Sequence, residues 1–300
     1  MNRLIKPVIY TFVLFFQTGV FAQEDLMNLI EDSEPIVEPV RSIFNGTRII
    51  NGHSVETRGA GTLEVIFMHR FGSLNSGAYN FWGLDEAWIR LGLEYSFTDD
   101  MTIGIGRSSY EKTFDGFLKY RFIEQTKGAR NFPFTATGFI SMAINSLKPT
   151  NPEQEIQFSS RLSYAYQVIL ARKFNKNLSL QLTPTIVHRN LVATPEESND
   201  IFALGFGGRY KVSKRLALTL EYFYQFNNNT EQVNYDALGV GLEIETGGHV
   251  FQIVFSNSRA MIEKSFITET TGNFFDGDIH LGFNITRAFY LKKKKPKEDW

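Results

Sequence analysis

The sequence predicts an all-β protein, a closed up-and-down antiparallel transmembrane β-barrel of about 12 strands. Three observations predict it: long segments in which apolar and polar residues alternate, an export signal at the N-terminus, and connections that alternate between short and long. Of the 300 residues, 43% are hydrophobic and 14% are aromatic, yet the mean hydropathy is only -0.18. This composition fits a wall that has one apolar and one polar face.

Residues 1–22 are predicted to be a signal peptide. Arg3 and Lys6 form its positive region, residues 8–16 are a short apolar run, and Ala22 stands at the expected cleavage position. The apolar run is shorter than the ~20 residues that a transmembrane helix needs, which argues against the alternative of an anchoring helix. We therefore expect export to the cell outer membrane after cleavage of this segment.

The mature chain is predicted to have three parts. Residues 23–61 are expected to form a periplasmic N-terminal extension that contains a small hairpin, because Asn51-Gly52 stands between β-forming residues. Residues 62–290 are expected to form the β-barrel, and residues 291–300 a basic C-terminal tail.

The barrel segment alternates with a period of two, which is typical of strands and does not fit helical spacing. In the first strand Leu63, Val65 and Phe67 share one face, whereas Glu64 and Arg70 share the other. Several runs are longer than the ~5–6 residues of an average strand and reach the ~9–11 that a membrane crossing requires. Strands are expected at 62–71, 88–97, 101–107, 114–124, 134–145, 157–173, 178–189, 201–210, 216–226, 236–245, 250–256 and 278–288.

The connections between these strands predict the orientation of the barrel. Bacterial barrels have short periplasmic turns and longer external loops. The turn at 174–177 would be periplasmic, whereas the loops at 72–87 and 257–277 would be external; 108–113 and 125–133 depart from the alternation. In a membrane barrel the apolar face meets lipid and the polar face lines the lumen. In the alternative, a secreted all-β binding module, the apolar face would point inward.

Several segments resemble an uncharacterised outer-membrane β-barrel family, domain of unknown function 5777. They are residues 46–56 (Gly-Thr-Arg-Ile-Ile-Asn-Gly-His-Ser-Val-Glu), residues 81–95, which begin Phe-Trp-Gly-Leu-Asp-Glu-Ala-Trp, and the runs 104–107 and 112–121. The resemblance covers most of the mature chain. It implies a barrel and implies no activity, so no functional residues are carried over from it.

Charged residues with lumen-facing parity form the main candidate site. Six acids and six bases suggest cross-barrel pairing, because isolated charges in a narrow lumen are costly to desolvate. The set could be a network that closes the lumen, a selective path for a small polar solute, or catalytic carboxylates. Its members are Glu64, Arg70, Arg90, Glu94, Asp115, Lys119, Arg121, Arg161, Arg209, Glu221, Glu243 and Glu245.

The first long loop is the second candidate site. It is denser in aromatic residues than a solvated loop needs, so we expect it to fold into the barrel mouth; docking of a partner or a sugar is the alternative. Its selected residues are Phe81, Trp82, Asp85, Glu86 and Trp88.

No catalytic residue, cofactor site or metal site is predicted, because the zincin, phosphate-loop and serine-elbow motifs are missing and the chain has no cysteine. The formal net charge of -1 gives no reason to expect nucleic acid as a partner. The expected partners are outer-membrane lipid, the barrel-assembly machinery and a small polar solute.

The predicted function is passive: a narrow pore, or a closed structural or assembly component. Two alternatives remain. One is a lipid-acting enzyme in the barrel wall, suggested by His69 and His188 on the apolar face. The other is the secreted all-β binding module.

Overall fold

The computed structural model describes residues 36–149, 151, 153, 155–192, 194–227 and 234–291. The predicted signal peptide, the first part of the predicted extension and the tail beyond residue 291 lie outside the described residues. The described chain divides into two units. In the smaller one, residues 36–39 and 126–132, strand β1 (Val37–Pro39) pairs antiparallel with β6 (Thr126–Gly128).

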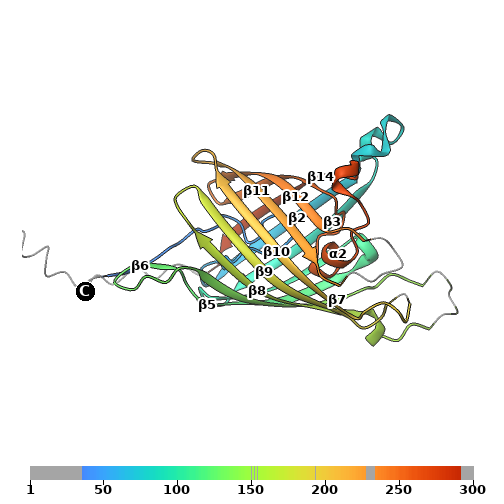
Figure 1. Cartoon of the computed structure of the whole chain (residues 1–300), viewed down its shortest axis with the longest axis horizontal. Helices are drawn as coiled ribbons and strands as arrows, with labels where there is room; N and C mark the ends of the chain where they lie inside the picture. The colour runs from blue at the N-terminus through green and yellow to red at the C-terminus, as the bar shows by residue number, and fades with distance from the viewer. Residues whose placement is uncertain are drawn as a thin grey trace, which may run out of the picture. The chain divides into compact units, whose positions relative to one another are not determined.

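The larger unit is a closed antiparallel barrel of twelve strands (Figure 1). Each strand pairs with the next barrel strand along the chain, and the last pairs with the first, so the predicted up-and-down barrel is confirmed. The strands are β2 (Thr62–Ser73), β3 (Ala87–Ser96), β4 (Met101–Ser108), β5 (Phe114–Ile123), β7 (Thr135–Ile144), β8 (Leu162–Lys173), β9 (Leu178–Arg189), β10 (Asp200–Lys211), β11 (Leu216–Gln225), β12 (Ala237–Thr246), β13 (His249–Ser256) and β14 (His280–Tyr290).

Strand bounds agree with the sequence prediction to within a few residues, with one larger difference. The strand expected at 157–173 begins only at Leu162. Before it, Ser159–Arg161 form the 3-10 turn η4, in which the backbone N–H of Leu162 donates to the carbonyl of Ser159. Alternation of apolar and polar residues over so few positions does not distinguish a turn from an extended strand.

Burial alternates along the strands, with polar side chains inside the barrel and apolar side chains outside. In β3, Arg90 and Glu94 are buried, whereas Leu91 and Leu93 are 53% and 46% exposed. An apolar exterior around a polar interior is the arrangement of a membrane barrel. It is the opposite of the soluble all-β module, whose apolar face would point inward.

Short helical segments occupy connections between strands. They are the 3-10 turns η1 (Leu74–Ser76), η2 (Ala78–Gly83), η3 (Tyr110–Lys112) and η5 (Phe274–Asp276), and the α-helix α2 (Glu263–Thr268). Within the described part of the chain, no helix is long and apolar enough to cross a membrane.

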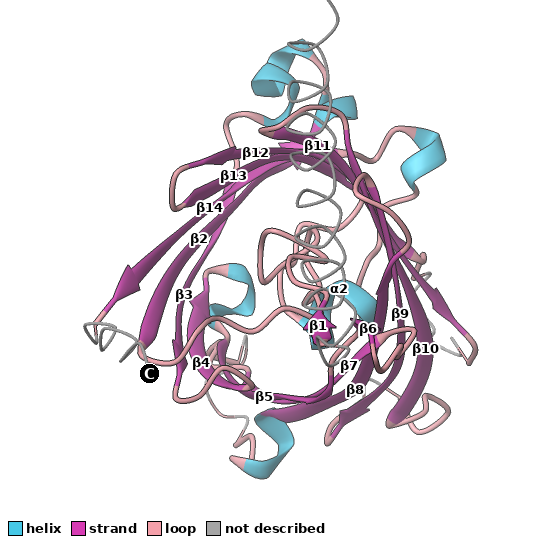
Figure 2. Ribbon diagram, turned by 90° about the vertical axis from the view of Figure 1, so that its left-hand side faces the viewer, coloured by secondary structure: helices cyan, strands magenta, loops and turns pink. Residues whose placement is uncertain are grey.

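Two segments of the chain are packed inside the barrel (Figure 2). One precedes the first barrel strand and the other connects β13 to β14. We call residues 43–57 the plug and residues 257–272 the inner loop, which includes α2. The plug belongs to the stretch that the sequence places in a periplasmic extension, but its residues lie within the barrel. The physical reason is its amphipathic character: Ile49 and Ile50 are 2% and 0% exposed, while its backbone groups bond to polar residues of the wall.

The face assignment leads to a first prediction. Replacing outward-facing Leu93 by arginine should impair membrane insertion, because arginine on the lipid face costs about 2–4 kcal/mol at the bilayer midplane. Heat-modifiable gel mobility of membrane fractions measures the folded share. Leu93→Phe, which keeps the position apolar, is the matched control. Normal insertion of Leu93→Arg together with loss of folding in Glu94→Leu would reverse the assignment of faces.

Candidate functional site in the barrel lumen

The plug enters and leaves the barrel at the same end. On its N-terminal side the carbonyl of Ser42 accepts a 2.9 Å hydrogen bond from Lys173 Nζ. On its C-terminal side the hydroxyl of Thr57 donates to the carbonyl of Asp99 at 2.7 Å. Lys173 and Asp99 both lie beside short turns, the β8–β9 and β3–β4 connections. The plug is therefore inserted as a loop from the end that carries these turns, called here the short-turn end.

Inside the barrel the plug reverses direction at Asn51-Gly52. Arg48 and His53 form an antiparallel bridge, and the backbone N–H of Ile49 donates to the carbonyl of Gly52 at 3.0 Å. The reversal stands at the Asn-Gly pair from which a hairpin is expected. The tip of this hairpin points into the lumen, where the wall supplies its remaining hydrogen-bond partners.

Glu221 of β11 holds the tip of the plug. Its carboxylate accepts hydrogen bonds from the backbone N–H groups of Ile50, Asn51 and Gly52 at 3.2, 3.0 and 3.0 Å. Glycine at position 52 makes room for this close approach, since a Cβ there would lie 3.2 Å from Glu221 Oε2 and 3.3 Å from the Phe223 ring. Charge-assisted bonds of this kind are stronger than neutral ones, so Glu221 is a principal anchor of the plug.

Two arginines add side-chain bonds around the same tip. Arg70 of β2 donates to the side-chain oxygens of Asn51 at 2.8 Å and of Asn284 at 2.9 Å. Arg48 of the plug pairs with Glu94 of β3 at 3.2 Å. Both guanidinium groups are buried and therefore need polar partners. The plug provides Asn51 for Arg70, and the wall provides Glu94 for Arg48.

The lower part of the plug is tied to the wall by further acids. Glu64 accepts a 2.7 Å hydrogen bond from the hydroxyl of Thr47 and one from Arg58 Nε at 2.7 Å. Glu245 accepts from Asn45 Nδ2 at 2.7 Å. These bonds lie between the hairpin tip and the short-turn end, so the plug is held along its length.

Within the predicted charge network, two pairs lie in the wall itself. Arg90 pairs with Asp115, and Arg209 Nε lies 2.8 Å from Glu243 Oε1. Six further members contact the plug rather than one another across the barrel. They are Glu64, Arg70, Glu94, Lys119, Glu221 and Glu245.

Two members of the predicted network lie elsewhere. Arg121 pairs with Asp100 of the β3–β4 turn at 2.7 Å, because β5 ends beside it in an irregularity of register. Arg161 belongs to the 3-10 turn η4, where strand parity does not apply, and it donates to the carbonyl of Leu147 at 2.7 Å. Their assignment to the lumen is corrected on these grounds.

The inner loop reaches the plug from the opposite end of the barrel. Phe266 of α2 is fully buried, and its ring packs edge-on against Phe223 with centroids 5.1 Å apart. Glu263 Oε1 lies 3.5 Å from Arg48 Nη1 and 3.8 Å from His53 Nε2. The sequence prediction treated 257–277 only as an external loop, although the apolar pairs at 261–262 and 266–267 are a signal for burial.

His53 occupies an apolar site at the base of the hairpin. Its ring centroid is 4.5 Å from that of Phe117 and 4.4 Å from that of Phe139. Neither ring nitrogen has a hydrogen-bond partner among the described residues. Burial, and then the positive charges of Arg48, Lys119 and Arg90, hold the pKa of His53 well below its usual value of 6.5.

The pKa of Glu263, whose carboxyl group lies beside His53, is shifted in the opposite direction. Burial raises the pKa of Glu263 above its usual value, and the charge of Arg48 opposes part of that rise. The contact between plug and inner loop therefore combines a histidine whose pKa is lowered with a carboxyl group whose pKa is raised.

The aromatic first loop does not cover the mouth. Phe81 and Trp82 are 55% and 52% exposed on η2, and Asp85 and Glu86 are exposed as well. Only Trp88 is half-buried, with Arg259 of the inner loop 5.3 Å from its ring centroid. Closure of the mouth by the Phe81–Trp82 segment is thus corrected: the inner loop is the segment that folds inward.

Polar cavities remain beyond each end of the plug. The one at the long-loop end has a volume of about 590 Å³ and is lined by residues that include Arg161, Arg189, Glu197 and Lys264. Arg189 and Glu197 lie 3.6 Å apart. The cavity at the short-turn end measures about 310 Å³ and is bordered by the plug at Glu56 and Thr57.

The histidines that suggested a lipid-acting enzyme have other partners. His188 Nδ1 lies 2.7 Å from Asp200 Oδ1, and His69 stacks on Phe283 with centroids 5.0 Å apart. Among the described residues no hydrogen bond joins either histidine to a serine. No group of three or more acidic or histidine side chains suited to a metal ion occurs in that part of the chain either.

The family of membrane-bound β-barrel domains known as domain of unknown function 5777 matches residues 44–289. The chain belongs to this family. The match begins in the plug and ends in β14, so the plug is part of the family domain and not an addition to it.

Comparisons with solved structures found further similarities, and no match was found among curated proteins. A NanC porin has a TM-score of 0.48 at 10% identity, over 76% of this chain and 98% of that chain. A KdgM porin has a TM-score of 0.44 at 10% identity, with the same coverage. An outer-membrane channel from Pseudomonas putida F1 has a TM-score of 0.45 at 15% identity, over 78% and 98%.

The anchoring role of Glu221 can be tested by Glu221→Ala. This change leaves three buried backbone N–H groups without an acceptor, at a cost of about 1–3 kcal/mol for an unsatisfied group. We expect a lower melting temperature in detergent and faster amide hydrogen exchange at residues 50–52. Glu86→Ala, at an exposed acid, is the control; unchanged exchange at 50–52 in Glu221→Ala would contradict the anchor.

The buried histidine predicts a pH dependence. Because its pKa is lower in the folded protein than in the unfolded chain, the unfolded chain binds more protons below about pH 6.5, and stability falls as the pH drops. The slope is at most about 1.4 kcal/mol per pH unit. Melting temperatures of the wild type and His53→Phe, measured from pH 7.5 to 5.5, should diverge on acidification.

Comparison of the wild type with His53→Phe separates the contribution of His53 to the pH dependence of stability from that of Glu263. The raised pKa of Glu263 acts with the opposite sign, since protonation then favours the folded state as the pH falls. Parallel pH profiles for wild type and variant would show that His53 titrates alike in the folded and unfolded states.

Proposed function

We propose that this protein is a gated outer-membrane channel for small polar solutes, held closed by its own N-terminal plug. The observation that carries the proposal is the insertion of residues 43–57 into the lumen as a loop from one end. Both ends of the loop lie at the short-turn end, so the plug can be withdrawn without threading the chain through the barrel.

The chemistry of the wall supports a plug that moves. The wall residues that hold it are largely charged or polar, such as Arg70, Glu94 and Glu221. When the plug leaves, water can hydrate these groups, whereas an apolar seam would expose hydrocarbon to the lumen. A wall of this kind is compatible with both a closed and a water-filled state.

The cavity at the long-loop end supports the class of solute. Its volume of about 590 Å³ lies in the range of small-molecule sites. Side chains of both signs, among them Arg189, Glu197 and Lys264, line it. Such a surface favours small polar solutes over apolar ones. Surrounding outer-membrane lipid and insertion by the barrel-assembly machinery are parts of the same proposal.

A closed structural or assembly component is the second candidate. It is favoured by the apolar contacts of the plug, since Ile43, Phe44 and Ile50 belong to one buried cluster with Phe117 and Phe139 of the wall. Burial of such side chains contributes about 1.5–3 kcal/mol each, which opposes withdrawal. The two candidates differ in whether the plug leaves the lumen.

A reversible crosslink distinguishes them. Asn51 Nδ2 at the plug tip lies 3.5 Å from Ser256 Oγ in β13, and the chain contains no cysteine. We expect the oxidised Asn51→Cys/Ser256→Cys protein to lack the channel openings of the wild type in planar bilayers, and reductant to restore them. The openings should disappear because the disulfide bond prevents the plug from leaving the lumen.

The two single-cysteine variants are the matched controls, because they lose the same side chains without forming the bond. Openings that persist in the oxidised double variant would contradict gating by the plug. Absence of openings in the wild type and in the reduced double variant would favour the closed structural component.

A further inference from the structure

The polar cavity at the long-loop end is built from segments that lie far apart in the sequence. Its volume is about 590 Å³. The connections that follow β4, β7 and β9 supply Glu111, Arg161 and Glu197, and the inner loop supplies Arg259 and Lys264. The α-helix of the inner loop, α2, lies inside the barrel (Figure 2). The cavity is therefore lined both by the wall connections and by the segment that the wall encloses.

The acids of this cavity are already paired with bases. Glu111 Oε2 lies 2.8 Å from Lys264 Nζ, and Glu269 pairs with the same ammonium group. Arg189 Nη2 lies 3.6 Å from Glu197 Oε2. These contacts join all three carboxylates of the lining to two of its four bases. The two remaining bases therefore determine how the cavity receives a charged solute.

Those two bases are Arg161 and Arg259. Neither forms an ion pair with a carboxylate in the part of the chain that the structure describes. With four bases and three acids, the lining carries a formal charge of +1. A positive charge in such a cavity attracts anions more strongly than the same charge on an open surface, because low-dielectric walls focus the field.

Aromatic rings hold Arg259 in place. Its guanidinium carbon lies 5.3 Å from the ring centroid of Trp88 and 5.4 Å from that of Tyr110. Cation–π contacts position a guanidinium through the ring faces, so most of its N–H donors stay available to a planar acceptor. The side chain is exposed, and it also borders a second cavity of about 240 Å³. A solute in the cavity can therefore reach it.

Backbone carbonyl groups hold Arg161. Its Nη1 donates to the carbonyls of Asn145 at 3.1 Å and Leu147 at 2.7 Å. Its Nε and Nη2 make no hydrogen bond among the described residues, and the residue is only half-buried. Neutral groups thus position this guanidinium, and two of its nitrogens are left for a ligand.

We infer that this cavity binds a small hydrophilic carboxylate, with Arg161 and Arg259 donating hydrogen bonds to its oxygens. Arginine suits this role because its planar fork matches the geometry of a carboxylate. The lining also includes Ser160, Thr268 and Thr271, whose hydroxyl groups suit a solute that carries hydroxyls of its own. The inference rests on the proposed channel in that it names the charge of the channel's solute. Binding itself can be measured in the closed protein.

Titration with three probes tests the charge preference. Gluconate, sorbitol and glucamine share a polyhydroxyl chain and end in a carboxylate, a hydroxyl and an ammonium group. In calorimetric titrations of the wild type in detergent at low salt, we expect gluconate to bind at least about tenfold more tightly than sorbitol, the effect of one charge-assisted hydrogen bond. Glucamine should bind least. Equal binding of gluconate and sorbitol, a preference for glucamine, or binding of none of the three would overturn the proposal.

Variants of the two arginines test where gluconate binds. Arg161→Gln and Arg259→Gln should each weaken gluconate binding by about tenfold and leave the affinity for sorbitol unchanged. Arg107→Gln is the matched control. Arg107 is also an exposed arginine with an aromatic ring, that of Phe114, 5.4 Å away, but it does not line the cavity. Equal losses in the control and the cavity variants would reflect net charge alone and would overturn the site.

The oxidised Asn51→Cys/Ser256→Cys protein separates this site from the proposed channel. Its plug is locked, and no plug residue lines the cavity, so it should bind gluconate as the wild type does. Gluconate binding by a wild type that never opens would overturn the channel and support the site. Channel openings without a preference for gluconate would support the channel and overturn the site. The three-probe comparison in the wild type decides the matter even if an arginine variant fails to fold, which heat-modifiable mobility would reveal.

Discussion

Satisfaction of buried charge is the constraint on which the interior depends. A closed wall lined with acids and bases has no stable dry state unless each charge finds a partner. The plug supplies these partners from its backbone as much as from its side chains, as at Glu221, whose carboxylate accepts three consecutive backbone N–H groups. The wall thus specifies the conformation of the plug, and the plug permits a wall of this polarity.

The plug and the inner loop contact one another in the lumen. Arg48 of the plug lies between Glu94 of the wall and Glu263 of the inner loop, so one guanidinium joins three parts of the chain. His53 stands beside the same contact, buried between the Phe117 and Phe139 rings. Displacement of the plug would leave Glu263 buried without its main counter-charge. Segments that enter from the short-turn end and from the long-loop end are therefore in direct contact within the lumen.

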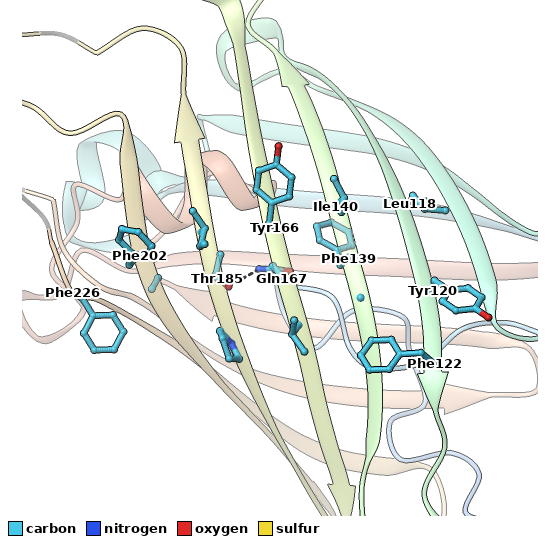
Figure 3. A pocket seen from close by; sticks show the side chains of 15 residues that line it. Leu118, Tyr120, Phe122, Phe139, Ile140, Tyr166, Gln167, Thr185, Phe202 and Phe226 are labelled. Carbon is cyan, nitrogen blue, oxygen red and sulfur yellow. Dashed lines mark hydrogen bonds between the residues drawn. The ribbon is translucent and has the colours of Figure 1, made fainter.

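The exterior obeys a different constraint. Membrane barrels satisfy every backbone group by closing the sheet, because hydrocarbon offers no hydrogen bonds. Strands β8 and β9 leave two positions beside Pro184 unpaired, a departure from that rule within the described wall. They lie beneath an apolar hollow of the outer face that Tyr166 and Phe202 border (Figure 3).

The sequence by itself determined the strands, their number and the face that most strand residues occupy, because a period of two is a local property that closure of the sheet does not alter. It also located the reversal at Asn51-Gly52, since turn chemistry is local. Only the tertiary structure decided that this hairpin lies inside the barrel, because the decision depends on partners such as Glu221, 169 to 171 residues away. The same holds for Arg121 and Arg161: parity could group them with the lumen, but a register irregularity and a 3-10 turn placed them at the barrel ends.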